Sequence, residues 1–333
     1  MPAVSAVASG ASPQGAVRYR DVCFEDVQVT RDVVYATAKG YWTALDGQDD
    51  ELPRLITERE GAMVKRALPL KLDVYEPAGD SLSKRPLVML LHGGAFYMHS
   101  KDEICMVEWC RELARRGYVA VSIDYRLGFR LNKGAIERAG YRALQDALSA
   151  LRFLVSEKET YRIDERAVFV GGSSSGAITA LNTVFMNDDN RPASTRRLGP
   201  PEPTDHRRDH AYSILGIIDM WGAVNDLSML ETADVPILGF QSRGDRTVPF
   251  GHDYSLQGMK PFNRLFFNKI YGSGAIAGRY ADMGRDMEFY PFEGDRHAPQ
   301  KDASGRPNDN FRFILEKICA FCSRLLPGSY RQR

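Results

Sequence analysis

The segment Gly172-Ser173-Ser174-Ser175-Gly176 constrains this chain most, because it joins an apolar strand pattern at 167–170 directly to a helix pattern at 177–182. Small residues around Ser174 allow a turn so tight that the serine hydroxyl projects from it. The turn also opens a helix, whose free N–H groups and positive end stabilise a negatively charged oxygen. Gly-Ser-rich turns are common, so a nucleophilic Ser174 is a hypothesis that depends on the other segments.

A second segment, 92–96, reads His-Gly-Gly-Ala-Phe and follows an apolar strand pattern at 86–91. Acyl transfer passes through an oxyanion that needs preorganised hydrogen-bond donors. The backbone N–H groups of Gly93 and Gly94 are candidate donors, because the main chain can approach a substrate closely where no Cβ intervenes. The N–H of Ser175 is the third candidate. The alternative is a plain Gly-Gly turn, and we interpret His92 as a loop-shaping residue.

A nucleophilic serine needs a base, and the chain has six histidines: His92, His99, His206, His210, His252 and His297. His297 is the best candidate, because it follows the strand pattern at 287–292 and a polar turn. His206 and His210 lie in a charged stretch and are expected to be solvated, whereas no strand precedes His252.

The acid that orients the base is predicted at Asp245, in the loop after a buried-strand pattern at 235–241. Open α/β sheets place ligands and catalytic side chains at this end of their strands. A carboxylate there can accept the Nδ1–H of the imidazole and fix its tautomer. Asp295 is a rival, but it lies too close in sequence to His297 to fold back onto that ring.

Ser174, Asp245 and His297 follow the order serine, acid, histidine, which is typical of α/β hydrolases. The chain resembles α/β-hydrolase fold serine esterases of the carboxylesterase and carbohydrate-esterase type, such as acetylxylan and feruloyl esterases. The likeness covers about 65–325 and rests on segments 92–96, 122–127, 145–147, 172–176, 244–249 and 294–297. It implies an α/β fold: a mostly parallel central sheet of about eight strands with helices on both faces. Within it, Asp124, Arg126 and Asp146 are expected to brace the sheet edge.

The resemblance implies a carboxylic ester hydrolase that acts on short-chain acyl or aromatic esters, with acetyl or feruloyl groups on plant polysaccharide as one possibility. Lipid or xenobiotic esters fit nearly as well. A serine peptidase and a non-catalytic hydrolase-like binding module are weaker alternatives. Aromatic side chains at the catalytic end are candidate pocket walls or, alternatively, core residues: Phe96, Tyr97, Trp221 and Phe250.

One domain suffices, with 1–64 as an N-terminal extension and leading strands and 65–333 as the catalytic part. The patterns predict strands at 27–30 with 32–35, 68–75, 86–91, 119–124, 167–171, 214–219, 235–240 and 286–291. They predict helices at 101–116, 137–157, 175–186, 255–281 and 307–325. The charged stretch 44–62 is expected to be a surface loop. The polar, proline-rich stretch 187–211 is expected to be a surface excursion, with a lid edge as the alternative.

Composition agrees with a globular enzyme: 44% of the 333 residues are hydrophobic and the net charge is +1. This balance argues against general nucleic-acid binding, and no apolar run reaches the ~18 residues of a membrane span. The sequence lacks the glycine-rich loops that bind nucleotides, so no cofactor is expected, and its five cysteines form no convincing metal site. Pairing of Cys105 with Cys110 stays open. Residues 1–15 lack an intact signal peptide, and the resemblance favours export after its removal, with a cytoplasmic start as the alternative.

Overall fold

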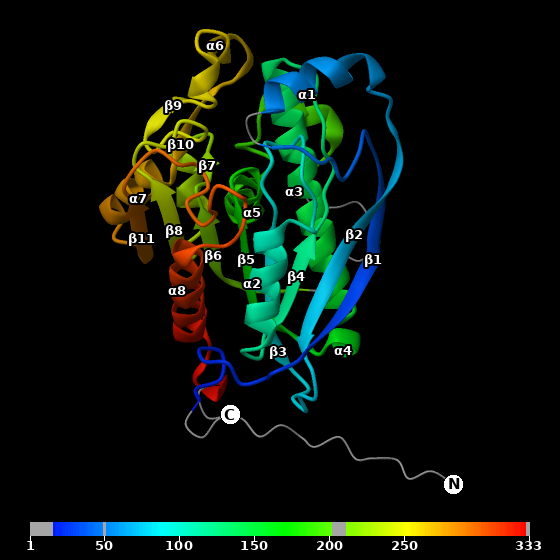
Figure 1. The fold of residues 1–333 in the computed structure, drawn as a ribbon, viewed down its shortest axis with the longest axis vertical. Coiled ribbons are helices and arrows are strands. Elements are labelled where there is room, and N and C mark those ends of the chain that lie inside the picture. The colour runs from blue at the N-terminus through cyan, green and yellow to red at the C-terminus, as the bar shows by residue number, and fades with distance from the viewer. Residues whose placement is uncertain (1–15, 49–50, 202–210, 331–333) are drawn as a thin grey trace.

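The structure is a computed structural model that describes residues 16–48, 51–201 and 211–330. Its centre is an eight-stranded sheet (Figure 1). In spatial order the strands are β1 (Val27–Gly40), β2 (Arg66–Pro77), β4 (Val119–Ile123), β3 (Arg85–Leu91), β5 (Ile163–Ser173), β6 (Ile214–Met220), β8 (Ile237–Ser242) and β11 (Met287–Phe292). β2 is antiparallel to both β1 and β4, and the other pairs are parallel. The predicted sheet is confirmed.

The helices cover both faces of this sheet. They are α1 (Leu52–Arg59), α2 (Ile104–Ala114), α3 (Lys133–Ser156), α4 (Lys158–Tyr161), α5 (Ser175–Phe185), α6 (Asn263–Phe266), α7 (Ser273–Asp282) and α8 (Asp309–Leu325). Alternate residues of β3 face two separate cores: Met89 belongs to a core that includes residues of α3, α5 and α7, whereas Leu90 belongs to one that includes residues of α2 and α8. All seven residues of β3 are buried, because parallel sheets are covered on both sides.

The stretch 44–62, expected to be a loop, contains α1 in its described part. The prediction was wrong because the charged residues occupy only one side of this helix. Leu52, Leu55 and Ile56 are spaced for the other side and are buried. Pro53 lies in the first turn, where a missing N–H is tolerated.

The stretch 255–281 was expected to be one helix, and this was also wrong. It contains α6, strand β10 (Lys269–Gly272) and α7, and β10 pairs with β9 (His252–Tyr254) and β7 (Ala223–Val224) in a second, three-stranded sheet. Pro261 interrupts a helix because it removes a backbone donor. The hydrogen bonds of the small sheet then stabilise residues 269–272 as a strand. Figure 1 shows α6, β9 and β10 at the same end of the molecule as α1.

The described part of 187–211 lies against α3. Residues 193–198 form a 3-10 helix in which Thr195 is buried, and the Gln145 side chain donates to the carbonyls of Leu198 and Pro200 at 2.9 and 3.0 Å. Residues 202–210, including His206 and His210, lie outside the described residues. Elsewhere on α3, Asp146 forms an ion pair with Arg126 at 2.7 Å, and both residues belong to the set expected to brace the sheet edge.

Candidate active site

Ser174 occupies a strained turn between β5 and α5. Its φ and ψ angles are 53° and −121°, a left-handed φ that side chains rarely adopt and that clusters at functional sites. The Ser174 N–H donates to the carbonyl of Met220 at 2.9 Å, and its carbonyl accepts the first helical bond from Ile178. The serine therefore lies at the carboxyl end of a central strand and directly at a helix N-terminus.

A close approach of main chains makes this turn possible. A Cβ atom on Gly176 would lie 2.1 Å from the carbonyl oxygen of Leu91, at the end of β3. Only a residue without a side chain lets α5 start so close to the neighbouring strand. The second small residue of the motif thus sets the position of the helix, and with it the position of Ser174.

The three residues predicted to form a proton-transfer chain lie in hydrogen-bond contact. His297 Nε2 is 2.8 Å from Ser174 Oγ, and His297 Nδ1 is 2.8 Å from Asp245 Oδ2. The other oxygen of Asp245 accepts from the N–H groups of Thr247 and Val248 at 2.8 and 3.1 Å. With Asp245 as acceptor at Nδ1, the imidazole presents Nε2 as a base to the serine hydroxyl.

The sheet explains how residues so far apart in sequence meet. Asp245 and His297 follow the parallel neighbours β8 and β11, whose carboxyl ends reach the same edge. Two bonds tie the loops together: the Gly244 N–H donates to the Gly294 carbonyl at 2.8 Å, and the Ser242 hydroxyl donates to the Arg296 carbonyl at 2.7 Å. The loop of the acid thereby supports the loop of the histidine.

Gly93 and Ser175, two of the predicted oxyanion donors, lie next to Ser174, and Gly94 follows in the same loop. A Cβ on Gly93 would lie 3.3 Å from the Ser174 Cβ, so this backbone passes directly beside the nucleophile. Gly94 has a φ of 104°, and a Cβ there would lie 2.2 Å from the Met98 carbonyl oxygen. Ser175 is the first residue of α5, where N–H groups have no partner within the helix.

The buried rings of His92 and Tyr125 pack against this loop. His92 stacks on Tyr125 with ring centroids 4.4 Å apart, and its Nδ1 lies 2.6 Å from the Gly93 carbonyl. Burial lowers the pKa of His92 to about 3, so its ring is neutral near pH 7. The Tyr125 hydroxyl donates to the His92 carbonyl at 2.7 Å and lies 3.3 Å from Ser175 Oγ. His92 is thus placed as a loop-shaping residue, whereas the role of Tyr125 was not evident from the sequence.

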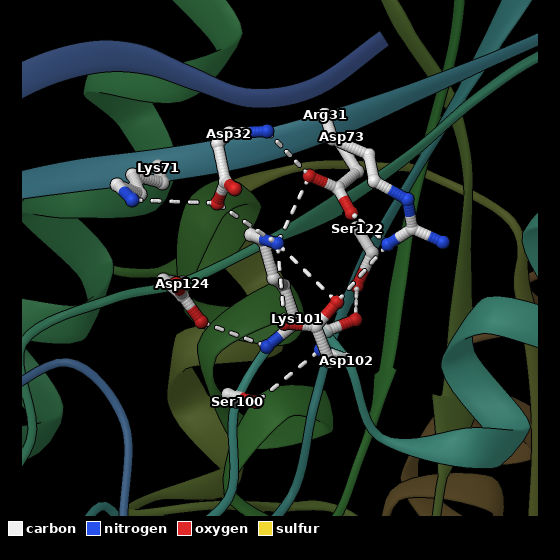
Figure 2. Close-up of polar contacts among 9 residues, drawn as sticks. All are labelled: Arg31, Asp32, Lys71, Asp73, Ser100, Lys101, Asp102, Ser122 and Asp124. Carbon is white, nitrogen blue, oxygen red and sulfur yellow. Dashed lines mark hydrogen bonds and ion pairs between the residues drawn. The ribbon is translucent and has the colours of Figure 1, made fainter. Parts of the chain in front are cut away.

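A cluster of charges around the buried Lys101 and Asp73 side chains lies at the far end of the same loop (Figure 2). The Lys101 ammonium lies 3.0 Å from Asp73, and it also reaches Asp32 and Asp102 at 3.3 and 3.2 Å. The Lys101 backbone is fixed too, because its N–H donates to Asp124 Oδ1 at 2.7 Å. Burial raises the pKa of Asp124 to about 7. No spacing in the sequence indicated this cluster, because its members come from β1, β2 and two loops.

Ser174 and His297 open into a cavity of about 40 Å³, which we call the serine cavity. Its apolar wall includes Leu52 from α1, Leu256 and Trp221, and its polar wall includes Glu103 and Lys301. Glu103 and Lys301 form an ion pair at 2.5 Å. A cavity of this size exceeds the ~10–15 Å³ that one water molecule needs.

The four aromatic residues predicted to form pocket walls have different positions. Trp221 lines the serine cavity, and its ring centroid lies 6.4 Å from that of His297. Phe96 lines a neighbouring cavity. Tyr97 does not line either cavity: it is fully buried, and its ring contacts Trp42 and Phe129.

Phe250 is also placed away from both cavities. Its ring packs on Gly274 at the start of α7 and on Phe289 of β11. Sequence position put Tyr97 and Phe250 beside catalytic residues, but their side chains turn into the packing between elements. For these two residues the alternative of core filling is the one that the structure favours.

Within the described ranges, no cluster of three or more His, Cys, Asp or Glu side chains is arranged to hold a metal ion. No helix in the described parts of the chain is long and apolar enough to cross a bilayer. Cys105 and Cys110 are reduced thiols buried on α2, and no disulfide joins them. Burial raises the pKa of Cys105 to about 12.

The sheet order, the turn at Ser174 and the positions of Asp245 and His297 define an α/β hydrolase. The BD-FAE family model matches residues 72–243, and the chain belongs to this family. The matched region contains the 92–96 loop and the serine turn, and it ends shortly before Asp245.

Partial relatives come from longer proteins. A stretch of 179 residues is 30% identical to the non-reducing polyketide synthase pkbA of Emericella nidulans, covering 50% of this chain and 6% of that protein. Another of 110 residues is 27% identical to gut esterase 1 of Caenorhabditis elegans, covering 32% of this chain and 19% of that protein. The aligned regions thus span only a small part of these relatives.

Solved structures of Thermogutta terrifontis esterase 2 share the fold. The form phosphorylated by paraoxon superposes with a TM-score of 0.56 at 23% identity, over 78% of this chain and 92% of that one. The propionate-bound form gives a TM-score of 0.55 at 22% identity over the same shares. The predicted α/β-hydrolase fold is confirmed.

Proposed function

We propose that this chain is a serine carboxylic-ester hydrolase that works through an acyl-enzyme. The observation that carries the proposal is the continuous hydrogen-bonded chain from Ser174 Oγ through the His297 ring to Asp245, with Gly93 and Gly94 beside the serine. Membership of the BD-FAE family and the esterase names of similar proteins support the same class of reaction.

In the proposed reaction, Ser174 Oγ attacks the ester carbonyl carbon while His297 Nε2 takes the hydroxyl proton. The N–H groups of Gly93, Gly94 and Ser175 bind the oxyanion that forms. Collapse breaks the bond to the alcohol oxygen, which leaves with the proton from His297. Water then attacks the acyl-enzyme, giving its proton to His297 Nε2, and the carboxylic acid is released as the serine regains that proton.

The polar wall of the serine cavity favours a polar alcohol. The alcohol oxygen receives its proton from His297, so this half of the ester lies on the side of the histidine loop. Gln300 and the Glu103–Lys301 ion pair line that side. Their donors and acceptors suit the hydroxyl groups of a carbohydrate, and we therefore propose acetyl or aromatic acyl esters of polysaccharide as the substrate class.

The test of the activity is the Ser174→Ala variant with p-nitrophenyl acetate. Loss of a nucleophile in such a chain lowers kcat by about 10⁴- to 10⁶-fold. Ser149→Ala is a matched control, because this hydroxyl only donates to a carbonyl within α3. Paraoxon should add one phosphoryl group to Ser174, as read by peptide mass spectrometry. Normal turnover by Ser174→Ala, or labelling elsewhere, would refute the mechanism.

The substrate class is tested separately with acetylated xylan, methyl ferulate and p-nitrophenyl esters of increasing acyl length. Preference for the first two over simple alkyl esters supports the carbohydrate proposal. Preference for simple esters with apolar alcohols supports a carboxylesterase for lipid or xenobiotic esters instead.

A further inference from the structure

Four cationic side chains gather near the edge of the sheet that carries the serine turn, and we call them the basic patch: Lys39, Lys65, Arg138 and Arg142. They come from β1, from the residue before β2 and from α3. Burial lowers the pKa of the Lys65 ammonium, and the charges of the other three and of Arg126 lower it further. Because a charge shifts a pKa only over a short distance, the members of the patch lie close together.

Carboxylates of the described residues do not neutralise the basic patch. Asp146 is committed to Arg126: its oxygens accept from the Arg126 backbone N–H at 2.8 Å and pair with the guanidinium at 2.7 Å. Among the described residues, no member of the patch forms an ion pair with Asp or Glu. Like charges held together repel each other, so an anion bound between them would relieve the repulsion.

Arg142 is the unusual member of the patch. Only 5% of its surface is exposed, and its Nη2 atom donates to the Gly128 carbonyl at 3.0 Å. Its Nε atom has no hydrogen-bond partner among the described residues. Burial lowers the pKa of this guanidinium to about 10, and the charge of Arg126 adds to the effect. A buried charge without a paired anion is costly, so packing alone gives no reason for an arginine at this position.

The other members face solvent. Lys39 and Lys65 are exposed, and Arg138 is half-buried. The Lys65 ammonium lies over the Tyr41 ring, 5.5 Å from its centroid, and this contact favours one position of a flexible side chain. An anion that arrives from solvent can therefore contact Lys65 and Arg138 directly, while the charge of Arg142 attracts it from below.

The sheet places the basic patch on the substrate side of the molecule. β1 runs in the same direction as β4, β3 and β5, so its last residues reach the edge at which the serine turn begins. Ile123, the last residue of β4, pairs with Leu72 of β2. The segment 66–71 of β2 and its partners in β1 therefore extend past this edge.

Two contacts join the surroundings of the patch to the 92–99 loop, which faces the serine. The Trp42 side chain follows β1, and its Nε1–H donates to the Tyr97 carbonyl at 2.7 Å. Gly128, whose carbonyl accepts from Arg142, donates its own N–H to the Phe96 carbonyl at 2.8 Å. The patch thus lies beside the loop proposed to hold the oxyanion.

We propose that the basic patch binds the carboxylate groups of an acidic polysaccharide, a chain substituted with uronic acid. The inference rests on the proposed function and deepens it by naming the class of polysaccharide. Charge complementarity and the position beside the serine support it. Single-stranded nucleic acids fit less well, because their bases stack on open aromatic faces. Here the face of Tyr41 carries Lys65, and Arg59 lies over the ring of Trp42.

The test measures binding by calorimetry with two unacetylated xylooligosaccharides of equal length, one of which carries a glucuronic acid side group. At low salt, the wild type should bind the acidic one about three- to tenfold more tightly, as expected for partly exposed ion pairs. The ratio should fall to about one in the double variant Lys65→Gln/Arg138→Gln, and also at about 0.5 M salt, which screens exposed charges. Lys84→Gln is the matched control: it removes a lysine before β3, at the opposite end of the sheet, and should keep the ratio.

Three results would overturn the inference: no measurable binding of the acidic oligosaccharide, equal affinities for the two in the wild type, or a preference that persists in the double variant. Tighter binding of a single-stranded oligonucleotide, lost in the same variant, would assign the patch to nucleic acid instead. These measurements need no turnover. Selective binding without hydrolysis of p-nitrophenyl acetate would refute the proposed function and leave the patch, whereas hydrolysis with equal affinities would refute the patch alone.

Discussion

The buried carboxyl of Asp219, at the edge of the site, allows the pH dependence of the free energy of unfolding to be tested. It lies near the end of β6, is fully buried, and accepts from the Gly222 N–H at 2.8 Å through Oδ1. Its Oδ2 atom has no hydrogen-bond partner among the described residues. Burial raises the pKa of this carboxyl to about 6, and the Ser273 side chain and the N–H of Gly222 offset the effect only in part. The turn that it stabilises carries Trp221, which has a φ of 52°.

The sign of the pH dependence follows from this raised pKa. Between the ordinary value of 3.8 and about 6, the folded protein binds more protons at Asp219 than the unfolded chain does. The stability from this group is therefore complete below the unfolded pKa and is lost as the pH rises through the folded pKa. From pH 5 to pH 8, the loss amounts to about 1.4 kcal/mol of the free energy of unfolding.

Asp219→Asn removes this titration and keeps an oxygen acceptor for Gly222. Urea unfolding of wild type and variant at pH 5 and pH 8 gives the assay. The variant should gain about 1.4 kcal/mol on the wild type between the two pH values, whatever its offset at either one. Asp282→Asn removes an exposed carboxyl from α7 and serves as control. An offset that is equal at both pH values, or that favours the wild type at pH 8, would refute the reasoning.

Three further predictions concern the loop that faces the serine. Gly94→Ala should lower kcat for p-nitrophenyl acetate by about 10²- to 10³-fold. The reason is that alanine does not fit the φ of 104° and its Cβ would displace the proposed oxyanion donor. A near-normal kcat would show that this N–H is not used. Tyr125→Phe removes the hydroxyl that bonds the His92 carbonyl and should lower kcat by about tenfold with little change in KM; an effect on KM alone would contradict it. Lys101→Met leaves Asp73 buried without its nearest cation. The free energy of unfolding, measured by urea denaturation, should fall by about 3–5 kcal/mol. A stability like that of the wild type would show that the cluster contributes little.

Much of the arrangement follows from the sequence because the chemistry lies at strand ends. Apolar runs such as 86–91 and 167–170 identify buried strands, and parallel strands align their carboxyl ends. Once Ser174 was placed at such an end, Asp245 and His297 were the candidates that followed later strands. The order of the three residues along the chain was therefore enough to predict that they meet. In the structure their side chains are in hydrogen-bond contact.

Side-chain direction in loops was not predictable in this way. Tyr97 and Phe250 lie next to residues of the site, yet both rings turn into the packing between elements. Positive φ values at Ala95, Phe96 and His99 redirect successive side chains in the 92–99 loop. Such angles are set by the main-chain bonds of the folded loop, including those to Gly94, and residue type does not reveal them.

A cavity lined by Ile178, Asn182 and Met186 shows where sequence periodicity misleads. Asn182 follows Ser174 and Ile178 at helical spacing, so in a single sequence it looks like one more position on a buried face. Other residues that line this cavity come from 255–270, part of the stretch 255–281 that was expected to be one helix and that instead contains α6, β10 and α7. Long-range pairing in the three-stranded sheet decides that conformation. The residues proposed to perform the chemistry therefore follow regular elements, whereas part of this cavity depends on a segment whose structure local patterns do not determine.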